Sequence, residues 1–156
     1  MAHGGIGLEA GYRSAAITCG AIAASIVLYA VIVELISVSQ APFAGFASEG
    51  GLRWLRILLW ANAALEVSLI GMMRRFLLAR ARAAGGAAQT GWFVTIAVVT
   101  AGLAEVPAVL GLVLFMFFGL RGDFYALCAL SLAVQAAYFP RLDGWREWAA
   151  KPVPSC

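Results

Sequence analysis

Residues 92–118 read WFVTIAVVTAGLAEVPAVLGLVLFMFF, an apolar stretch in which Glu105 is the one ionisable residue. A helix rises ~1.5 Å per residue, so about 20 residues cross the ~30 Å hydrocarbon core of a bilayer. The stretch is therefore long enough to span a membrane with some tilt. It does not alternate apolar and polar residues as a barrel strand does, and hydrocarbon leaves the backbone no outside hydrogen-bond partner. Both points predict a transmembrane helix.

Three further apolar stretches flank this one, and together they predict four transmembrane helices. The four predicted helices cover residues 14–37, 54–82, 92–118 and 123–140. The composition agrees, because the 156 residues are 63% hydrophobic and 12% charged, whereas a soluble domain is roughly 45–50% apolar and about 25% charged. We therefore predict one all-α domain over residues 1–156, an integral membrane four-helix bundle. Its short tail, 141–156, is expected to lie along the membrane interface through Trp145 and Trp148.

The connections carry turn and loop signals. Residues 40–51 are rich in Gly, Ser and Ala and read as a loop that dips into the interface through Phe43 and Phe46. The second helix is expected to stop at Gly85-Gly86, and Asp123 is expected to cap the fourth helix. The glycine-rich N-terminal residues 4–7 are expected to be disordered.

The distribution of Arg and Lys predicts the orientation. In a four-helix chain the N-terminus, the second connection and the C-terminus share one side of the membrane. That side holds eight of the eleven cations (Arg13, Arg74, Arg75, Arg80, Arg82, Arg141, Arg146 and Lys151), and the other side holds Arg53, Arg56 and Arg121. By the positive-inside rule both termini are cytoplasmic, and the localisation predicted is a bacterial inner membrane.

Several classes of function are not indicated by the sequence. His3 is the single histidine, so no Ser-His-Asp or Cys-His catalytic arrangement forms, and we predict no enzyme activity. There is no phosphate-binding glycine loop and no C-x-x-C pair, so no cofactor and no metal are expected. The cations do not interleave with aromatics on a polar face, which argues against nucleic acid. Cys19 and Cys128 lie in apolar runs and are expected to be buried, inert thiols.

The informative residues are three acids inside the apolar stretches: Glu34, Glu66 and Glu105. An ionised acid at the centre of a membrane helix costs roughly 2.5–3.5 kcal/mol on insertion scales, unless it is neutralised or paired. Glu34 lies near a helix end and reads as an interfacial acid that reaches water. Glu66 follows Asn62 by one helical turn, a spacing that allows a hydrogen-bonded packing contact. Glu105 has no cation within a turn of it, so a packed acid and a functional proton or cation site are both open for it.

Small residues form stripes on two of the predicted helices, the first at strict four-residue spacing. Ala16, Gly20 and Ala24 form one such stripe, and Ala97, Ala101, Glu105 and Ala108 lie along another. Small residues let helices approach closely. We expect both stripes to pack within one bundle rather than to form a dimer.

The segment Ala101 to Met116, AGLAEVPAVLGLVLFM, resembles the carboxylate-bearing helix of the proteolipid (c) subunits of rotary ATPases. The basic segment 74–82 before it is similar to the cytoplasmic loop of that family's helical hairpin. The resemblance extends over the second and third helices and implies an ion-binding role for Glu105. The sequence departs from the family in its second helix, which carries Trp60 and Glu66 in place of dense glycine. The third helix is also similar to that of small bacterial four-helix membrane proteins, a likeness that implies no activity.

Two functions follow as expectations. The first is a non-catalytic subunit or assembly factor of a larger membrane complex, with other membrane subunits or a second copy as partners in the bilayer. The alternative is a proteolipid-like proton or cation site at Glu105, whose surroundings Glu66 and Asn62 shape.

Overall fold

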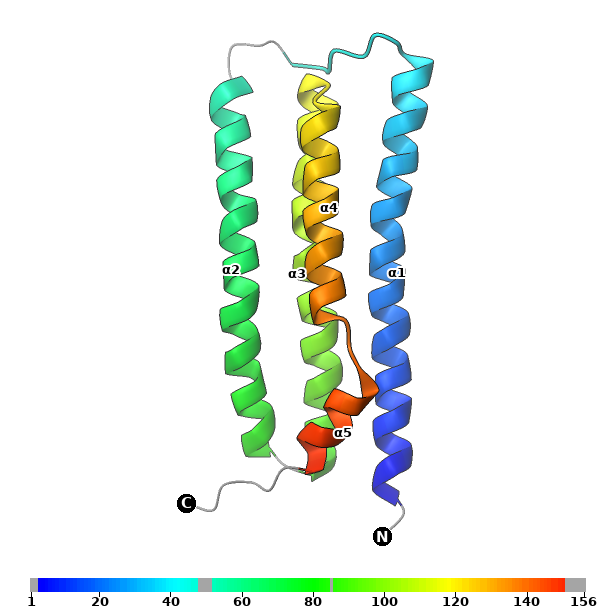
Figure 1. Cartoon of the computed structure of the whole chain (residues 1–156), viewed down its shortest axis with the longest axis vertical. Helices are drawn as coiled ribbons and strands as arrows, with labels where there is room; N and C mark the ends of the chain where they lie inside the picture. Colours follow the sequence, from blue (N-terminus) through cyan, green and yellow to red (C-terminus); the bar gives the residue numbers. More distant parts are fainter. Residues whose placement is uncertain (1–2, 48–51, 85, 151–156) are drawn as a thin grey trace.

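The computed structural model describes residues 3–47, 52–84 and 86–150, and all of its regular elements are helices. They are α1 (His3–Ser39), α2 (Leu52–Ala84), α3 (Gly86–Phe118), α4 (Arg121–Tyr138) and α5 (Leu142–Ala150) (Figure 1). The prediction of an all-α chain with four packed helices is confirmed at this level. A fifth, short helix replaces part of the expected tail.

Three of the described helices are long and apolar enough to cross a bilayer. Their candidate spans are Gly7–Ser39 in α1, Arg53–Ala81 in α2 and Ala88–Phe118 in α3. Large apolar side chains on α1 and α2 lie exposed on the outside of the bundle, among them Leu35, Trp54 and Met72. An apolar exterior is what lipid requires, so length, composition and surface together indicate an integral membrane protein.

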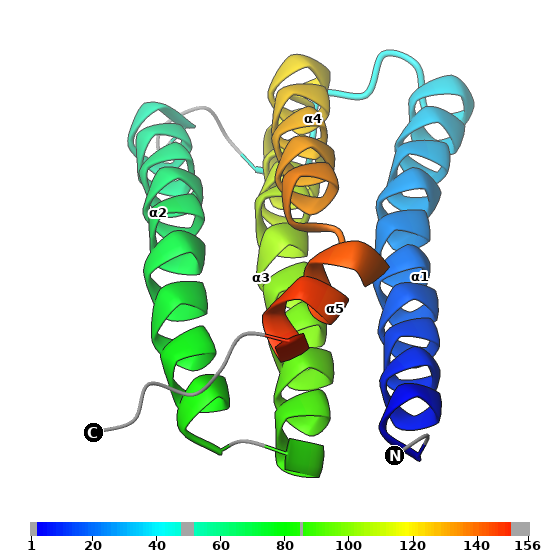
Figure 2. The same cartoon turned by 60° about the horizontal axis from the view of Figure 1, so that its bottom comes forward.

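Helix α3 is the centre of the arrangement. It packs against α1, α2 and α4, and in both views α1 and α2 lie on opposite sides of the α3–α4 pair (Figures 1 and 2). The core follows the line of α3, with Ile26, Phe115 and Phe124 fully buried in one cluster. Gly111 makes the α3–α4 contact possible, since an added Cβ would lie 3.1 Å from the Cα of Phe124.

The helices extend beyond the predicted ends at one end of the bundle. Helix α1 begins at His3 rather than at residue 14, and α3 begins at Gly86 rather than at residue 92. The expectation of disorder in residues 4–7 is therefore wrong for the backbone. For α1 the reason is tertiary: α5 packs against its extended segment, where Trp145 stacks edge-on against Tyr12, and Arg146 pairs with Glu9 at 2.6 Å (Figure 2). The Trp148 side chain and residues 151–156 lie outside the described part of the chain.

The connection after α1 is tied to the end of α3. The N–H groups of Phe46 and Ala47 donate to the carbonyls of Met116 and Phe117, which have no partner within their own helix. Phe43 packs on Phe115 with ring centroids 5.0 Å apart, whereas Phe46 is exposed. The described part of this loop ends at residue 47.

Two local expectations are wrong. Asp123 does not cap α4, since the residue at the N-cap is Leu120 and no side-chain cap bond forms there. Its carboxylate instead lies buried against α2. The stripe of Ala16, Gly20 and Ala24 does not pack within the bundle either, because Gly20 and Ala24 are exposed.

Candidate functional site

The carboxyl of Glu105 is bound by two hydroxyls from the facing helix. The Tyr29 hydroxyl donates to Oε1 of Glu105 at 2.7 Å, and the Ser25 hydroxyl contacts the same oxygen. Ser25 and Tyr29 are four residues apart on α1, so their side chains share one face of that helix. Glu105 lies near the middle of the α3 span and is half-buried. The site therefore lies inside the expected hydrocarbon layer, at the contact between α1 and α3.

The backbone hydrogen bonding of α3 is interrupted just after Glu105, and a side chain of α4 supplies a bond there. Pro107 has no N–H, so the usual backbone bond to the carbonyl of Leu103 is missing. One residue later, the N–H of Ala108 donates to the Ser131 hydroxyl of α4 at 2.9 Å. Ser131 is fully buried, which fixes this part of α3 against α4. The backbone near Glu105 is thereby positioned by α4, and the carboxyl by α1.

Among the residues that the structure describes, no cation pairs with Glu105. Glu34 and Asp123 differ from it in this respect. Arg121 binds both oxygens of Glu34 at 2.6 and 2.7 Å, and Arg56 lies 3.0 Å from Asp123. Ionic pairing therefore accounts for those two acids but not for Glu105.

Glu66 lies on the opposite side of α3 and is not joined to this site. Its Oε2 is buried and has no hydrogen-bond partner in the described part of the chain. The bond expected from Asn62 is not formed, and Asn62 is exposed on α2. The carboxyl of Glu66 lines a groove of about 480 Å³ whose other walls are Leu69, Met72, Met73, Phe76 and Leu103. Of the three residues predicted to form one site, the structure places Glu105 of α3 against α1 and leaves Glu66 and Asn62 of α2 apart from it.

The partners of Glu105 that sequence reasoning missed are Ser25 and Tyr29. A tyrosine in the middle of an apolar stretch was the available signal, because tyrosine in membrane helices is enriched at the interface rather than at mid-depth. A buried hydroxyl finds a partner, so Tyr29 pointed to an acceptor on another helix. Only the packing of α1 on α3 identifies that acceptor as Glu105.

The Glu105 site offers few ligands to a divalent metal ion. Glu105, Ser25 and Tyr29 supply few oxygens, while hard cations such as Ca²⁺ take roughly six to eight oxygen ligands. Within the described residues no group of three or more His, Cys, Asp or Glu side chains forms a metal cluster.

Comparisons of the chain with protein-family models, with curated proteins and with solved structures give no match.

Proposed function

We propose that this chain is a proton-binding membrane protein in which Glu105 takes up and releases a proton near the middle of the bilayer. The proposal places α4 as a fourth, shorter membrane helix, since 18 residues rise about 27 Å. It also places both termini in the cytoplasm of a bacterial cell, with the protein in the inner membrane. The excess of arginines on the side of the α2–α3 connection supports that orientation.

One observation carries the proposal: two oxygens lie within hydrogen-bond distance of the Ser25 hydroxyl. The Ser25 Oγ lies 2.6 Å from the Ile22 carbonyl and also contacts Oε1 of Glu105. A hydroxyl has a single proton to donate. Ser25 can donate to either oxygen but not fully to both, and when it donates to the carbonyl, a proton on the Glu105 carboxyl completes the second bond. The protonated carboxyl then donates to Ser25, and no cation is needed.

The same hydroxyls support release of the proton. When Glu105 ionises, Ser25 and Tyr29 can both donate to the carboxylate, and hydrogen bonds to a charged form favour that form. A carboxyl without such donors in hydrocarbon would stay permanently protonated, and one paired with an arginine would stay permanently ionised. Glu105 has neither arrangement, and this supports reversible protonation.

Labelling with dicyclohexylcarbodiimide, which reacts with protonated membrane carboxyls, tests the proposal. We expect peptide mass spectrometry to find the adduct on Glu105 in the wild type and in Glu66→Gln, and to find none at this position in Glu105→Gln. In proteoliposomes, Glu105→Gln is expected to reduce any proton flux that the wild type supports. An unlabelled Glu105 together with an unchanged flux would overturn the proposal.

A second candidate function is membership of a larger membrane complex, and Glu66 supports it. A buried carboxyl oxygen without a donor is costly, and its groove opens onto the exposed side chains of Leu69, Met72 and Phe76. A transmembrane helix of another subunit that carries a hydrogen-bond donor would satisfy Glu66 and cover these side chains.

Purification in mild detergent tests this second candidate. A partner that co-purifies with the wild type should be lost in Glu66→Leu and retained in Glu105→Gln. A stable monomer in every detergent would count against it.

A further inference from the structure

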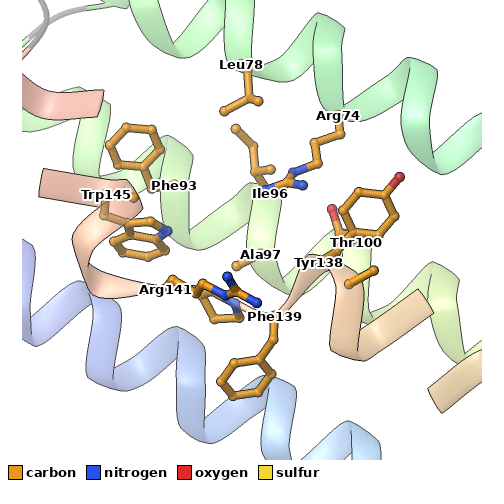
Figure 3. Close-up of a pocket in the computed structure, with 13 residues that line it drawn as sticks. Arg74, Leu78, Phe93, Ile96, Ala97, Thr100, Tyr138, Phe139, Arg141 and Trp145 are labelled. Atoms are coloured by element: carbon orange, nitrogen blue, oxygen red, sulfur yellow. The ribbon is translucent and has the colours of Figure 1, made fainter. Parts of the chain in front are cut away.

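A second site lies where α5 closes one end of the bundle. A cavity of about 300 Å³ opens there between α2, α3 and the connection from α4 to α5. Figure 3 shows two guanidinium groups directed into this space, that of Arg74 from α2 and that of Arg141 from the segment before α5. The cavity plays no part in the Glu105 site, which lies on the α1 side of α3.

The charge of the cavity is entirely positive. Among its described lining residues, Arg74 and Arg141 are cationic and none is acidic. Neither arginine forms an ion pair within the described residues. The guanidinium of Arg74 lies 4.9 Å from the ring centroid of Tyr138, a cation–π contact that holds it in place without neutralising it. Two uncompensated guanidinium groups in one cavity favour an anionic ligand.

A buried hydrogen-bond donor without a partner lies beside the cavity. A smaller inner space of about 10 Å³ lies next to it and shares Thr100, Tyr138 and Phe139 with it. Gln135 lines this inner space, and its Nε2 is buried with no partner among the described residues. The residue is only 8% exposed. A buried amide donor without an acceptor is costly, and an oxyanion or its bound water would satisfy it.

The remaining walls are apolar and aromatic. Phe93 and Trp145 stack with ring centroids 5.4 Å apart at the α5 side, and Leu78 and Ile96 line the cavity as well. Tryptophan and tyrosine are typical of the membrane interface, where one end of a ligand is apolar and the other charged. Basic cavities between transmembrane helices on the cytoplasmic side bind anionic head groups.

We propose that this cavity binds a phosphate oxyanion, either the headgroup of an anionic lipid or a free phosphate. The two guanidinium groups bind the oxyanion, Gln135 donates to it or to its bound water, and the aromatic walls contact the apolar body of a lipid. An ionic hydrogen bond is worth roughly 1.5–3 kcal/mol, so loss of one guanidinium is expected to weaken binding about 10-fold to 100-fold.

Native mass spectrometry of the detergent-purified chain tests the proposal, with phosphatidylglycerol, phosphatidylcholine and inorganic phosphate as separate probes. The test variant is Arg74→Gln/Arg141→Gln. The matched control is Arg75→Gln/Arg80→Gln, which removes the same charge from the same end of the bundle outside the cavity lining. Because Arg141 is exposed, the single variant Arg141→Gln keeps the test available if the double variant does not fold.

The lipid form of the proposal predicts that the wild type retains phosphatidylglycerol at least ~10-fold more strongly than phosphatidylcholine. Binding should be lost in the test variant and kept in the control. The free-phosphate form predicts that inorganic phosphate binds with the same dependence on the two arginines and displaces the lipid. Gln135→Glu, which puts an acid of the same size in the inner space, should abolish binding in either form. Equal losses in the test and control variants, or binding to neither probe, would overturn the proposal.

Discussion

The substitution Tyr29→Phe tests the proposed state of Glu105, because it removes one hydroxyl and leaves the ring in place. The hydroxyl donates to Oε1 of Glu105 at 2.7 Å. Hydrogen bonds between neutral side chains within membrane helices average about 0.6 kcal/mol and reach about 1.7. A bond to an ionised group is worth more, about 1.5–3 kcal/mol. A neutral Glu105 therefore predicts that Tyr29→Phe lowers the free energy of unfolding by about 1 kcal/mol.

Glu105→Gln supplies the reference for this value, because a glutamine resembles a protonated glutamate in size and in hydrogen bonding. If Glu105 is neutral in the wild type, Tyr29→Phe lowers the free energy of unfolding by about the same amount in the wild type and in the Glu105→Gln background. The assay is equilibrium unfolding in mixed micelles, followed by circular dichroism, for the four chains of this double-mutant cycle. Tyr138→Phe is the control, since the Tyr138 hydroxyl makes no hydrogen bond within the described residues.

Two results would refute the reasoning. If Tyr29→Phe leaves the free energy of unfolding almost unchanged, Tyr29 and Glu105 do not interact in the membrane. A cost that is larger in the wild type than in the Glu105→Gln background by more than ~1 kcal/mol would mean that Glu105 is ionised.

Three further predictions concern the packing that holds the site. Arg56→Met leaves Asp123 without its cation and should lower the free energy of unfolding, measured by thermal unfolding in detergent. Because Arg56 is 54% exposed, we expect a loss of about 2 kcal/mol rather than the ~3–5 kcal/mol of a fully buried pair. Gly111→Leu should separate α3 from α4 and destabilise the fold by about 1–3 kcal/mol or more. Gly102→Leu is the control and should unfold as the wild type does, since an added Cβ at Gly102 has nothing within 4 Å. Gly45→Ala puts a Cβ 2.3 Å from a carbonyl oxygen of α3 at a φ of +87°, and should lower the free energy of unfolding by at least ~1 kcal/mol. A wild-type melting temperature in Gly45→Ala would contradict the description of that loop.

The long helices were predictable because apolar length alone specifies them. A stretch such as 92–118 has no other stable form in hydrocarbon, so its class follows from composition. The helix ends were not predictable, because the start of α1 is held by contacts with α5 and the start of α3 lies against α1, where Thr90 is close to Gly11. Polar or small residues such as Gly7 and Gln89 carry no local signal that such contacts exist, and a prediction from apolar pattern stops where the pattern stops.

The candidate site was predictable only in part. Glu105 stood out because a lone acid in an apolar run is costly. Its partners did not, since Ser25 and Tyr29 lie about 80 residues away in the chain. The expected bond between Asn62 and Glu66 rested on spacing within one helix. Spacing places two side chains on one face, but it does not make them bond when the neighbouring helix covers only one of them.

Infrared difference spectroscopy in lipid bilayers tests the neutral carboxyl most directly. The spectrum of Glu105→Gln is subtracted from that of the wild type at neutral pH, with Glu66→Gln measured in parallel. A neutral Glu105 predicts that the carbonyl stretch of a protonated carboxyl is present in the wild type and lost in Glu105→Gln. If the substitution instead removes the stretches of a carboxylate, then Glu105 is ionised in the membrane at that pH and the proposed resting state is wrong.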